Sequence, residues 1–215
     1  MEGHPIVAAL YDRVLGPAEH GDLAALRARA LEAARGRTLE VAAGTGHNLH
    51  HYPPGVTSLV LAEPDPHMAS RLRKRLESVQ SDIERIEVAS ASAESLPYED
   101  SSFDSVVCTL GLCTIPDPAA ALAEIRRVLV PGGSFCFLEH VRSERRGRAR
   151  RQDLVTPPWR RVAGGCHPNR DTGAEIAAAG FRIDWLERGT MPRAPGFLRP
   201  MIIGVARRPG SELDG

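Results

Sequence analysis

The stretch TLEVAAGTGHN, residues 38–48, carries the decisive signal for the fold. Residues 38–43 are mostly apolar or small and indicate a buried strand, which contains one carboxylate, Glu40. Gly44 and Gly46 follow at once, and glycine allows a tight turn and a close approach of a ligand to the backbone. We expect a short helix after this turn, because amide groups at a helix N-terminus bind negative groups. The stretch therefore predicts a ligand site at the end of a strand.

On both sides of this stretch, strand-like runs alternate with segments of helical periodicity, a pattern typical of a parallel sheet covered on both faces. The predicted strands cover residues 38–43, 58–62, 83–89, 105–109 and 134–138. The predicted helices cover residues 22–35, 68–79 and 119–129. Asp22 is expected to cap the first helix, and VPGG at 130–133 predicts a helix stop and a turn. Two late runs, 181–186 and 200–206, predict a hairpin at the sheet edge, so we predict an α/β fold with a doubly wound, mostly parallel sheet.

Composition is that of an ordinary globular domain. Of the 215 residues, 42% are hydrophobic and 25% are charged, and the formal net charge is zero. A zero net charge gives no overall attraction to nucleic acid, so we expect no nucleic-acid partner. The sequence has no apolar run of about 18 residues and no signal peptide, from which we expect a cytoplasmic protein.

The four cysteines are Cys108, Cys113, Cys136 and Cys166. They form no CxxC pair and lie at no paired histidine spacing, so the sequence predicts no metal site. Cys108 and Cys136 lie within apolar runs, and we expect both to be reduced thiols in the core.

Glu40 decides between two classes of nucleotide-like ligand. A dinucleotide fingerprint needs a third glycine, where this chain has Leu49. A pyrophosphate would also meet the carboxylate of Glu40, and two like charges about 4 Å apart at an effective dielectric of about 20 repel by roughly 4 kcal/mol. S-adenosylmethionine carries a cationic ammonium and sulfonium that the same carboxylate would attract. The site therefore favours adenosylmethionine, with a bare turn and a solvated Glu40 as the alternative.

A second acid lies about twenty residues beyond the turn. Glu63 ends the second predicted strand in LAEPD, where an acid accepts hydrogen bonds from both ribose hydroxyls of a bound nucleoside. This position indicates an adenosine moiety without distinguishing the two ligand classes. Asp65 precedes Pro66, and we expect it to cap the helix that follows.

Several longer motifs resemble those of a known protein family. The series LEVAAGTG, LAEPD, SAESLPYEDSSFDSVV and AEIRRVLVPGGSFCFLEH resembles the class I S-adenosylmethionine-dependent methyltransferases. That resemblance implies a seven-stranded, Rossmann-like sheet with helices on both faces. More narrowly, HNLHHYPPGV, CTLGLCTIPD, FLEHV and GGCHPNRDT resemble the thiol S-methyltransferase branch. The quinone-type C-methyltransferases share the first set of motifs and remain an alternative, as does a cofactor-binding module without catalysis.

The resemblance also implies a division of the chain and a set of cofactor contacts. One methyltransferase domain would cover residues 1–215, with a helical cover over about 1–36, a cofactor-binding core over about 37–141, and an acceptor-side cover with the last strands over about 142–208. The cofactor residues would be Tyr11, Glu40, Ala42, Gly44, Thr45, Gly46, Glu63, Pro64, Ala93, Glu94, Thr109 and Leu110. Two positions depart from the family. Ser92 stands where an aspartate is common, and Ala42 stands where a glycine is common, which suits alanine only if the backbone there is not left-handed.

The acceptor is expected to be a small molecule, a thiol or a lipophilic compound. Methyl transfer needs in-line alignment in a dry pocket and no metal ion. A thiol reacts as the thiolate, so a base would help, and His140 is the first candidate and His167 the second. Either ring is equally explained as a hydrogen-bonded structural histidine. The expected lining of the acceptor pocket is Cys113, Trp159, Cys166 and His167. For Cys113 and Cys166 the alternative, which we favour, is small apolar packing.

A basic stretch follows the fifth predicted strand. VRSERRGRARRQ, residues 141–152, contains a dense run of arginines over 142–151. The functional interpretation is a weak contact with an anionic membrane surface or with an acidic group of a substrate. The alternative, which we favour, is a solvated helix face.

Overall fold

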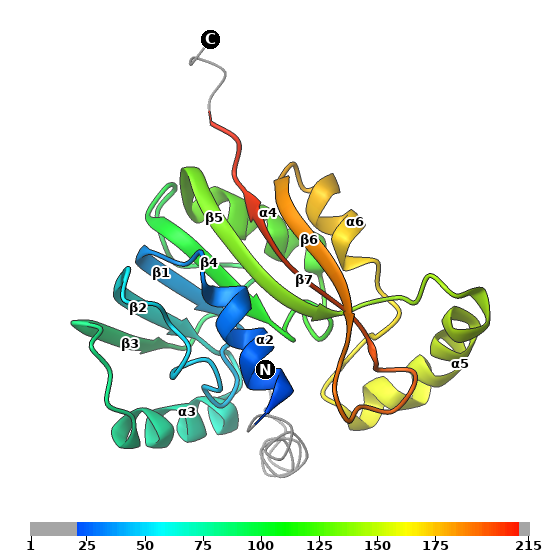
Figure 1. The fold of residues 1–215 in the computed structure, drawn as a ribbon. Helices are drawn as coiled ribbons and strands as arrows, with labels where there is room; N and C mark the ends of the chain where they lie inside the picture. The colour runs from blue at the N-terminus through cyan, green and yellow to red at the C-terminus, as the bar shows by residue number, and fades with distance from the viewer. Residues whose placement is uncertain (1–20, 211–215) are drawn as a thin grey trace.

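The computed structural model describes residues 21–210, which form one seven-stranded sheet with helices on both sides (Figure 1). The strands lie in the order β3-β2-β1-β4-β5-β7-β6. Their bounds are β1 (Gly36–Val41), β2 (Val56–Ala62), β3 (Arg85–Ala89), β4 (Phe103–Thr109), β5 (Leu129–His140), β6 (Arg182–Thr190) and β7 (Pro200–Arg207). Strands β1 to β5 pair in parallel, and β7 runs antiparallel to both β5 and β6. The predicted doubly wound sheet and its edge hairpin are therefore confirmed.

The order of the strands alone predicts where a ligand site lies. The chain builds outward from β1 to β2 and β3 in one direction, then returns to add β4 and β5 on the other side of β1. Neighbouring crossovers leave opposite faces at this reversal, which opens a crevice at the carboxyl ends of the strands. The crevice lies where β1 and β4 end, at Val41 and Thr109.

Alternating side chains on the central strands give the sheet two hydrophobic faces. In β4, Val106 belongs to one core cluster and Val107 to the other. The first cluster includes Leu122 and Ile125 of α4 (Pro118–Val128) and Ile176 of α6 (Thr172–Ala178). The second face is covered by α2 (Asp22–Leu31) and α3 (Pro66–Ser78). Cys108 and Cys136 are fully buried within these clusters, which confirms them as core thiols.

Several local predictions differ from the structure. The turn at residues 44–51 does not continue into a helix, so the amides that face the crevice belong to turns. Residues 130–133 lie inside β5, where the left-handed Gly132 absorbs a shift in register with β4. Asp22 lies in the first turn of α2, and the N-cap position belongs to Gly21. The helix α6 was not predicted, because seven residues carry too little periodicity to separate it from a loop.

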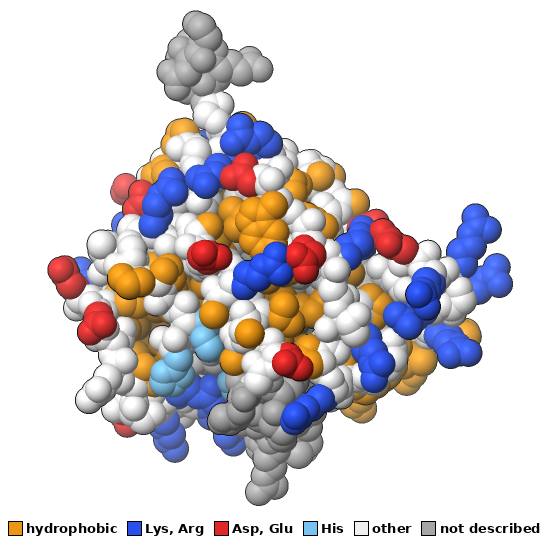
Figure 2. Space-filling view, in the orientation of Figure 1, with side chains coloured by type: hydrophobic (Ala, Val, Ile, Leu, Met, Phe, Trp, Pro, Cys, Tyr) orange, Lys and Arg blue, Asp and Glu red, His pale blue; other side chains and the backbone are white. Residues whose placement is uncertain are grey.

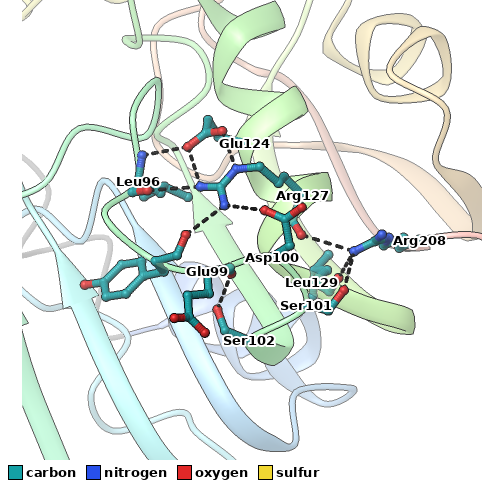
Figure 3. A network of polar contacts seen from close by, with 10 residues as sticks. Leu96, Glu99, Asp100, Ser101, Ser102, Glu124, Arg127, Leu129 and Arg208 are labelled. Carbon is teal, nitrogen blue, oxygen red and sulfur yellow. Dashed lines mark hydrogen bonds and ion pairs between the residues drawn. The ribbon is translucent and has the colours of Figure 1, made fainter.

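A polar network fixes the loop that leads from β3 to β4 (Figure 3). Arg127, near the end of α4, donates from Nε to Glu124 Oε1 at 2.7 Å and from Nη1 to Asp100 Oδ1 at 2.8 Å. Its two Nη groups also donate to the carbonyls of Tyr98 and Leu96, at 2.7 and 3.0 Å. These bonds hold the loop against α4.

The remaining helix, α5 (Arg146–Val162), extends away from the body of the sheet (Figure 1). Gln152 anchors it: its Nε2 group donates to three backbone carbonyls and its Oε1 atom accepts from the Ser143 amide. Figure 2 shows basic side chains on the outer surface of this part of the molecule. Leu154 and Val162 of the same helix are 78% and 70% exposed. A contact of this surface with an anionic membrane stays a prediction. Within residues 21–210, no helix is long and apolar enough to cross a bilayer.

Candidate cofactor and acceptor site

A small pocket opens at the crevice between the ends of β1 and β4. Its lining consists of Arg27, Glu40, Ala42, Ala43, Gly44, His47 and Thr109. Four of these residues, Glu40, Ala42, Gly44 and Thr109, were predicted from the sequence as cofactor contacts. The glycine-rich turn and the carboxylate ahead of it therefore face one shared space.

Glu40 lies at the base of this pocket with 2% of its surface exposed. Asn48 Nδ2 donates to Oε1 at 2.8 Å, and the Tyr52 hydroxyl donates to Oε2 at 2.5 Å. Burial raises the pKa of the Glu40 carboxyl to about 7, although both hydrogen bonds and Arg27 act in the opposite direction. A cation bound beside this carboxyl would restore its ionised form, so the site has a built-in preference for positive charge.

Arg27 is a pocket residue that the sequence analysis missed. It extends from α2 with only 2% of its surface exposed, and its Nη1 group donates to Asn48 Oδ1 at 3.0 Å and to Thr109 Oγ1 at 2.7 Å. The signal was present, because Arg27 lies at helical spacing from Leu23 and Leu31 on the apolar face of the helix. A guanidinium beside Glu40 gives the pocket a second, opposite charge, which suits the carboxylate of an amino-acid ligand.

Glu63 is tied to the glycine turn rather than lying free at the end of β2. Its Oε2 atom accepts from the Gly44 amide at 2.7 Å, and its Oε1 atom accepts from the Asp65 amide at 2.9 Å. A carboxylate has about four acceptor positions, so both oxygens keep capacity for ribose hydroxyls. Asp65 caps α3 as predicted, accepting from the amides of His67 and Met68 at 2.7 and 3.2 Å.

Two non-glycine residues at the pocket edge have left-handed backbones. Ala42 has φ of 53° and Leu110 has φ of 55°. Alanine suits position 42 only if the backbone there is not left-handed, and the structure shows that it is. Ala42 is therefore strained by about 1–2 kcal/mol. A side chain at the neighbouring Gly111 would meet Ala42 Cβ at 2.9 Å, so the ends of β1 and β4 pack too closely there for any larger residue. Strain of this kind persists where the surrounding structure enforces it, as at ligand sites.

The other predicted cofactor residues lie outside the lining of this pocket. Thr45 and Ala93 are buried, and Gly46 has φ of 84° with Leu72 against it. Glu94 holds its own loop together, since its carboxylate accepts from the Ser92 hydroxyl at 2.5 Å and from the Asp117 amide at 2.9 Å. Pro64 is half-buried between Glu63 and Asp65. Tyr11 lies outside the described residues, and these contacts stay predictions.

The predicted acceptor residues converge at the end of β5. The Cys113 and Cys166 sulfur atoms are 3.8 Å apart, and His140 Nδ1 lies 3.8 Å from Cys113 Sγ. His140 Nε2 lies 2.8 Å from Met191 Sδ, which has no hydrogen to donate, so we assign the ring hydrogen to Nε2. Nδ1 is then an unprotonated lone pair that faces the two thiols. Hydrogen bonding with the Cys113 thiol lowers the pKa of the Cys166 thiol to about 5.

Two residues that were not predicted hold Cys113 in place. Glu139 is fully buried, and its carboxylate accepts from the amides of Gly111, Leu112 and Cys113 at 2.9, 2.9 and 3.3 Å. Arg170 donates to the carbonyls of Leu112 and Ile115 from the other side. The turn from Thr109 to Cys113 therefore borders the cofactor pocket at its first residue and the thiol cluster at its last.

Trp159 and His167 cover this cluster. The Trp159 ring meets Phe197 edge-on at 5.2 Å and packs against Cys113 and Cys166, as expected of a cover over the acceptor end. The His167 amide donates to the Cys113 carbonyl at 2.7 Å. His167 Nδ1 is buried without a hydrogen-bond partner in the described part of the chain. Trp159 Nε1 interacts with the Cys166 sulfur and helps to lower the pKa of that thiol.

Comparison with known proteins places this geometry in a family. A family model described as a methyltransferase domain matches residues 39–137. The thiol S-methyltransferase TMT1B of Rattus norvegicus is 37% identical over 170 residues, which cover 78% of this chain and 69% of that protein. The chain belongs to the class I S-adenosylmethionine-dependent methyltransferases. Its cofactor is therefore S-adenosylmethionine.

Other relatives of this methyltransferase differ in the acceptor that their names state. A demethylmenaquinone methyltransferase of Deinococcus radiodurans is 37% identical over 134 residues, which cover 60% of this chain and 54% of that protein. The solved structure of a methyltransferase from Methanosarcina mazei shares the fold, with a TM-score of 0.67 at 20% identity over 81% of this chain and 93% of that chain. The family, the fold and the cofactor are thus established, and the acceptor is a separate question.

The pKa of Glu40 makes cofactor affinity depend on pH in this methyltransferase. With a pKa of about 7 in the ligand-free protein, Glu40 is protonated below that pH and must lose its proton when the ammonium binds. We therefore expect affinity to fall by up to about tenfold per unit as pH drops from about 7 to 5.5. Calorimetric titration with adenosylmethionine checks this. The Glu40→Gln variant should bind adenosylmethionine more weakly at pH 8, and its affinity should not change with pH in this range. NAD should not bind to the unaltered protein. If the affinity of the unaltered protein for adenosylmethionine does not depend on pH, Glu40 does not recognise the ammonium.

Proposed function

We propose that this methyltransferase transfers the methyl group of adenosylmethionine to the sulfur of a small thiol. The observation that carries the proposal is the position of His140 Nδ1, which lies 3.8 Å from the Cys113 sulfur while Nε2 lies against Met191 Sδ. An imidazole lone pair is suited to accept the proton of a thiol. The relatives aligned over 78% of the chain are named thiol S-methyltransferases, which supports the same acceptor class.

The reaction requires a thiolate and an in-line approach. The acceptor thiol gives its proton to His140 Nδ1, and the thiolate then attacks the methyl carbon. A carbon–sulfur bond forms as the bond from that carbon to the sulfonium breaks, and its electron pair stays on the cofactor sulfur. The products are a thioether and S-adenosylhomocysteine. The negative thiolate and the positive sulfonium neutralise each other as the reaction proceeds. An apolar site therefore stabilises the charged reactants less than water does and lowers the barrier to transfer.

The protein contributes mainly through position. Glu40 and Arg27 would hold the ammonium and carboxylate of the methionine moiety, and Glu63 would hold the ribose. The methyl group would then point toward the turn from Thr109 to Cys113, on whose far side His140 lies. Aligning two reactants in this way is worth about 7–11 kcal/mol of a bimolecular barrier.

A panel of acceptors tests the proposal. We expect labelled methyl groups to pass from adenosylmethionine to small alkyl thiols, with the thioether identified by mass spectrometry. The matched control is the corresponding alcohol, which has the same shape but is far less acidic, and it should accept no label. Label in a demethylmenaquinone analogue instead would identify the quinone-type alternative, which the Deinococcus relative supports over a smaller part of the chain. Tight cofactor binding with no transfer to any acceptor would identify a binding module.

A further inference from the structure

Three side chains that bind soft metal ions meet at the acceptor end of the sheet. Cys113 follows β4, His140 ends β5, and Cys166 follows α5. One ligand atom from each side chain lies within 4.8 Å of the other two. The three residues are 1%, 8% and 7% exposed. The sequence showed no metal-binding spacing because the fold, rather than a short motif, brings these residues together.

The distances within the cluster match those between the ligands of a zinc ion. Zinc binds cysteine sulfur at about 2.3 Å and histidine nitrogen at about 2.0–2.1 Å in tetrahedral geometry, which places two sulfur ligands about 3.8 Å apart and a sulfur and a nitrogen about 3.6 Å apart. The Cys113 and Cys166 sulfurs are 3.8 Å apart, and Cys113 Sγ is 3.8 Å from His140 Nδ1. These two distances therefore match those of a bound zinc ion, and the ligand atoms of Cys166 and His140 lie within 4.8 Å of each other.

The surroundings prepare the histidine as a ligand. Met191 Sδ accepts from His140 Nε2, which leaves the lone pair of Nδ1 directed at the two sulfurs. A hydrogen bond on the far ring nitrogen is the usual way in which proteins orient a metal-binding histidine. His167 Nδ1, in the residue after Cys166, is buried without a hydrogen-bond partner in the described residues. An unpaired buried polar atom beside the cluster indicates that a further polar group completes this site.

We propose that Cys113, Cys166 and His140 Nδ1 bind a zinc ion whose fourth position takes the sulfur of the acceptor. The second half of this inference rests on the proposed thiol acceptor. Three protein ligands with one open position is the arrangement of catalytic rather than structural zinc sites. A thiol that coordinates such an ion loses its proton to solvent, and the bound thiolate then attacks the methyl carbon as described above. His140 acts in this state as a metal ligand, and coordination replaces proton uptake by the ring.

Metal analysis of the whole chain tests the first half without any assay of activity. We expect one zinc ion per chain after incubation with zinc and dialysis under reducing, oxygen-free conditions. Cobalt(II) in place of zinc should give the charge-transfer absorption of cysteine thiolates and the visible bands of a tetrahedral site. Absence of bound metal, or a disulfide between Cys113 and Cys166 that persists under these reducing conditions, would each overturn the inference.

Variants assign the ligands. Cys113→Ala, Cys166→Ala and His140→Ala should each weaken zinc binding by about 100-fold or more, since each removes a direct ligand. Cys136→Ala is the matched control, because Cys136 is equally buried but lies in the core of the sheet away from the cluster, and it should retain the ion. Serine replacements at 113 and 166 keep the side-chain size if an alanine variant fails to fold. Retention of metal by the three ligand variants would refute the assignment.

The open coordination position has its own test. Ethanethiol added to the cobalt protein should increase the sulfur charge-transfer absorption, whereas its methylated product should not. Methyl transfer to thiols at full rate by protein stripped of metal would overturn the role of the ion and leave the proposed function intact. A metal-loaded protein whose spectrum responds to no thiol, and which methylates only a quinone precursor, would instead overturn the proposed function and leave the metal site in place.

Discussion

Gly44→Val is expected to abolish useful binding of adenosylmethionine while leaving the protein folded. Gly44 has φ of 58° and lines the cofactor pocket, and a Cβ atom built there has no contact within 4 Å to the rest of the described residues beyond its chain neighbours. The added side chain would therefore occupy the open space that the ligand needs. A branched residue with a left-handed backbone also costs about 1–2 kcal/mol of stability. We expect affinity to fall by about 100-fold or more, which corresponds to roughly 3 kcal/mol, as measured by calorimetry.

Gly132→Val is the matched control for this variant. Gly132 also has a left-handed backbone, with φ of 74°, and also has open space around a built Cβ atom. It lies near the start of β5, at the opposite end of that strand from His140. The two variants should lose similar stability in thermal unfolding, and only Gly44→Val should lose the ligand. Equal affinities in both would mean that the glycine turn does not contact the cofactor.

Part of the cofactor pocket could be predicted because its signals are local. Glu40, Gly44 and Glu63 lie at strand ends, and a parallel sheet with reversed strand order brings such ends together whatever the side-chain details. Asp65 is an equally local signal, since a cap depends on a few adjacent residues. The helix expected after Gly46 failed for a physical reason as well: a turn that packs against Leu72 meets the same need for exposed amides without helical periodicity.

The acceptor half was less predictable because its geometry depends on contacts distant in sequence. Cys113, His140 and Cys166 were each named as candidates, yet nothing in the sequence places their sulfur and nitrogen atoms at contact distance. Their positions depend on Glu139 and Arg170, which fix the turn after β4 from two sides. A charged residue within an apolar run, as in Glu139 and in Arg27 of α2, was the signal that the sequence offered. Such a residue must be paired when buried, so it marks a site even when its partner is unknown.

His140→Ala is expected to lower the turnover of a thiol acceptor by about 10²–10⁴-fold near neutral pH, the contribution of a well-placed acid–base group. An ordinary thiol has a pKa of about 8.5, so only a few per cent is thiolate at pH 7. In the proposed mechanism the lone pair of His140 Nδ1 helps to form the thiolate in one of two ways. The ring either accepts the thiol proton itself or binds a metal ion that causes the thiol to lose its proton. Cofactor affinity should hardly change, because His140 does not line the cofactor pocket.

The pH profile separates this chemical role from packing. As pH rises through the pKa of the acceptor, thiolate forms without help, so the deficit of His140→Ala should shrink toward the activity of the unaltered protein. Met191→Leu is a useful companion, since it keeps the packing but removes the sulfur that accepts from His140 Nε2. With Nε2–H no longer held, the ring can place its hydrogen on Nδ1, and we expect a smaller loss with the same pH dependence. A histidine that only supports the end of β5 would behave differently, because its removal would lower thermal stability and activity together by the same factor at every pH. That outcome would mean that the enzyme uses no base and acts only by positioning a thiolate that forms spontaneously.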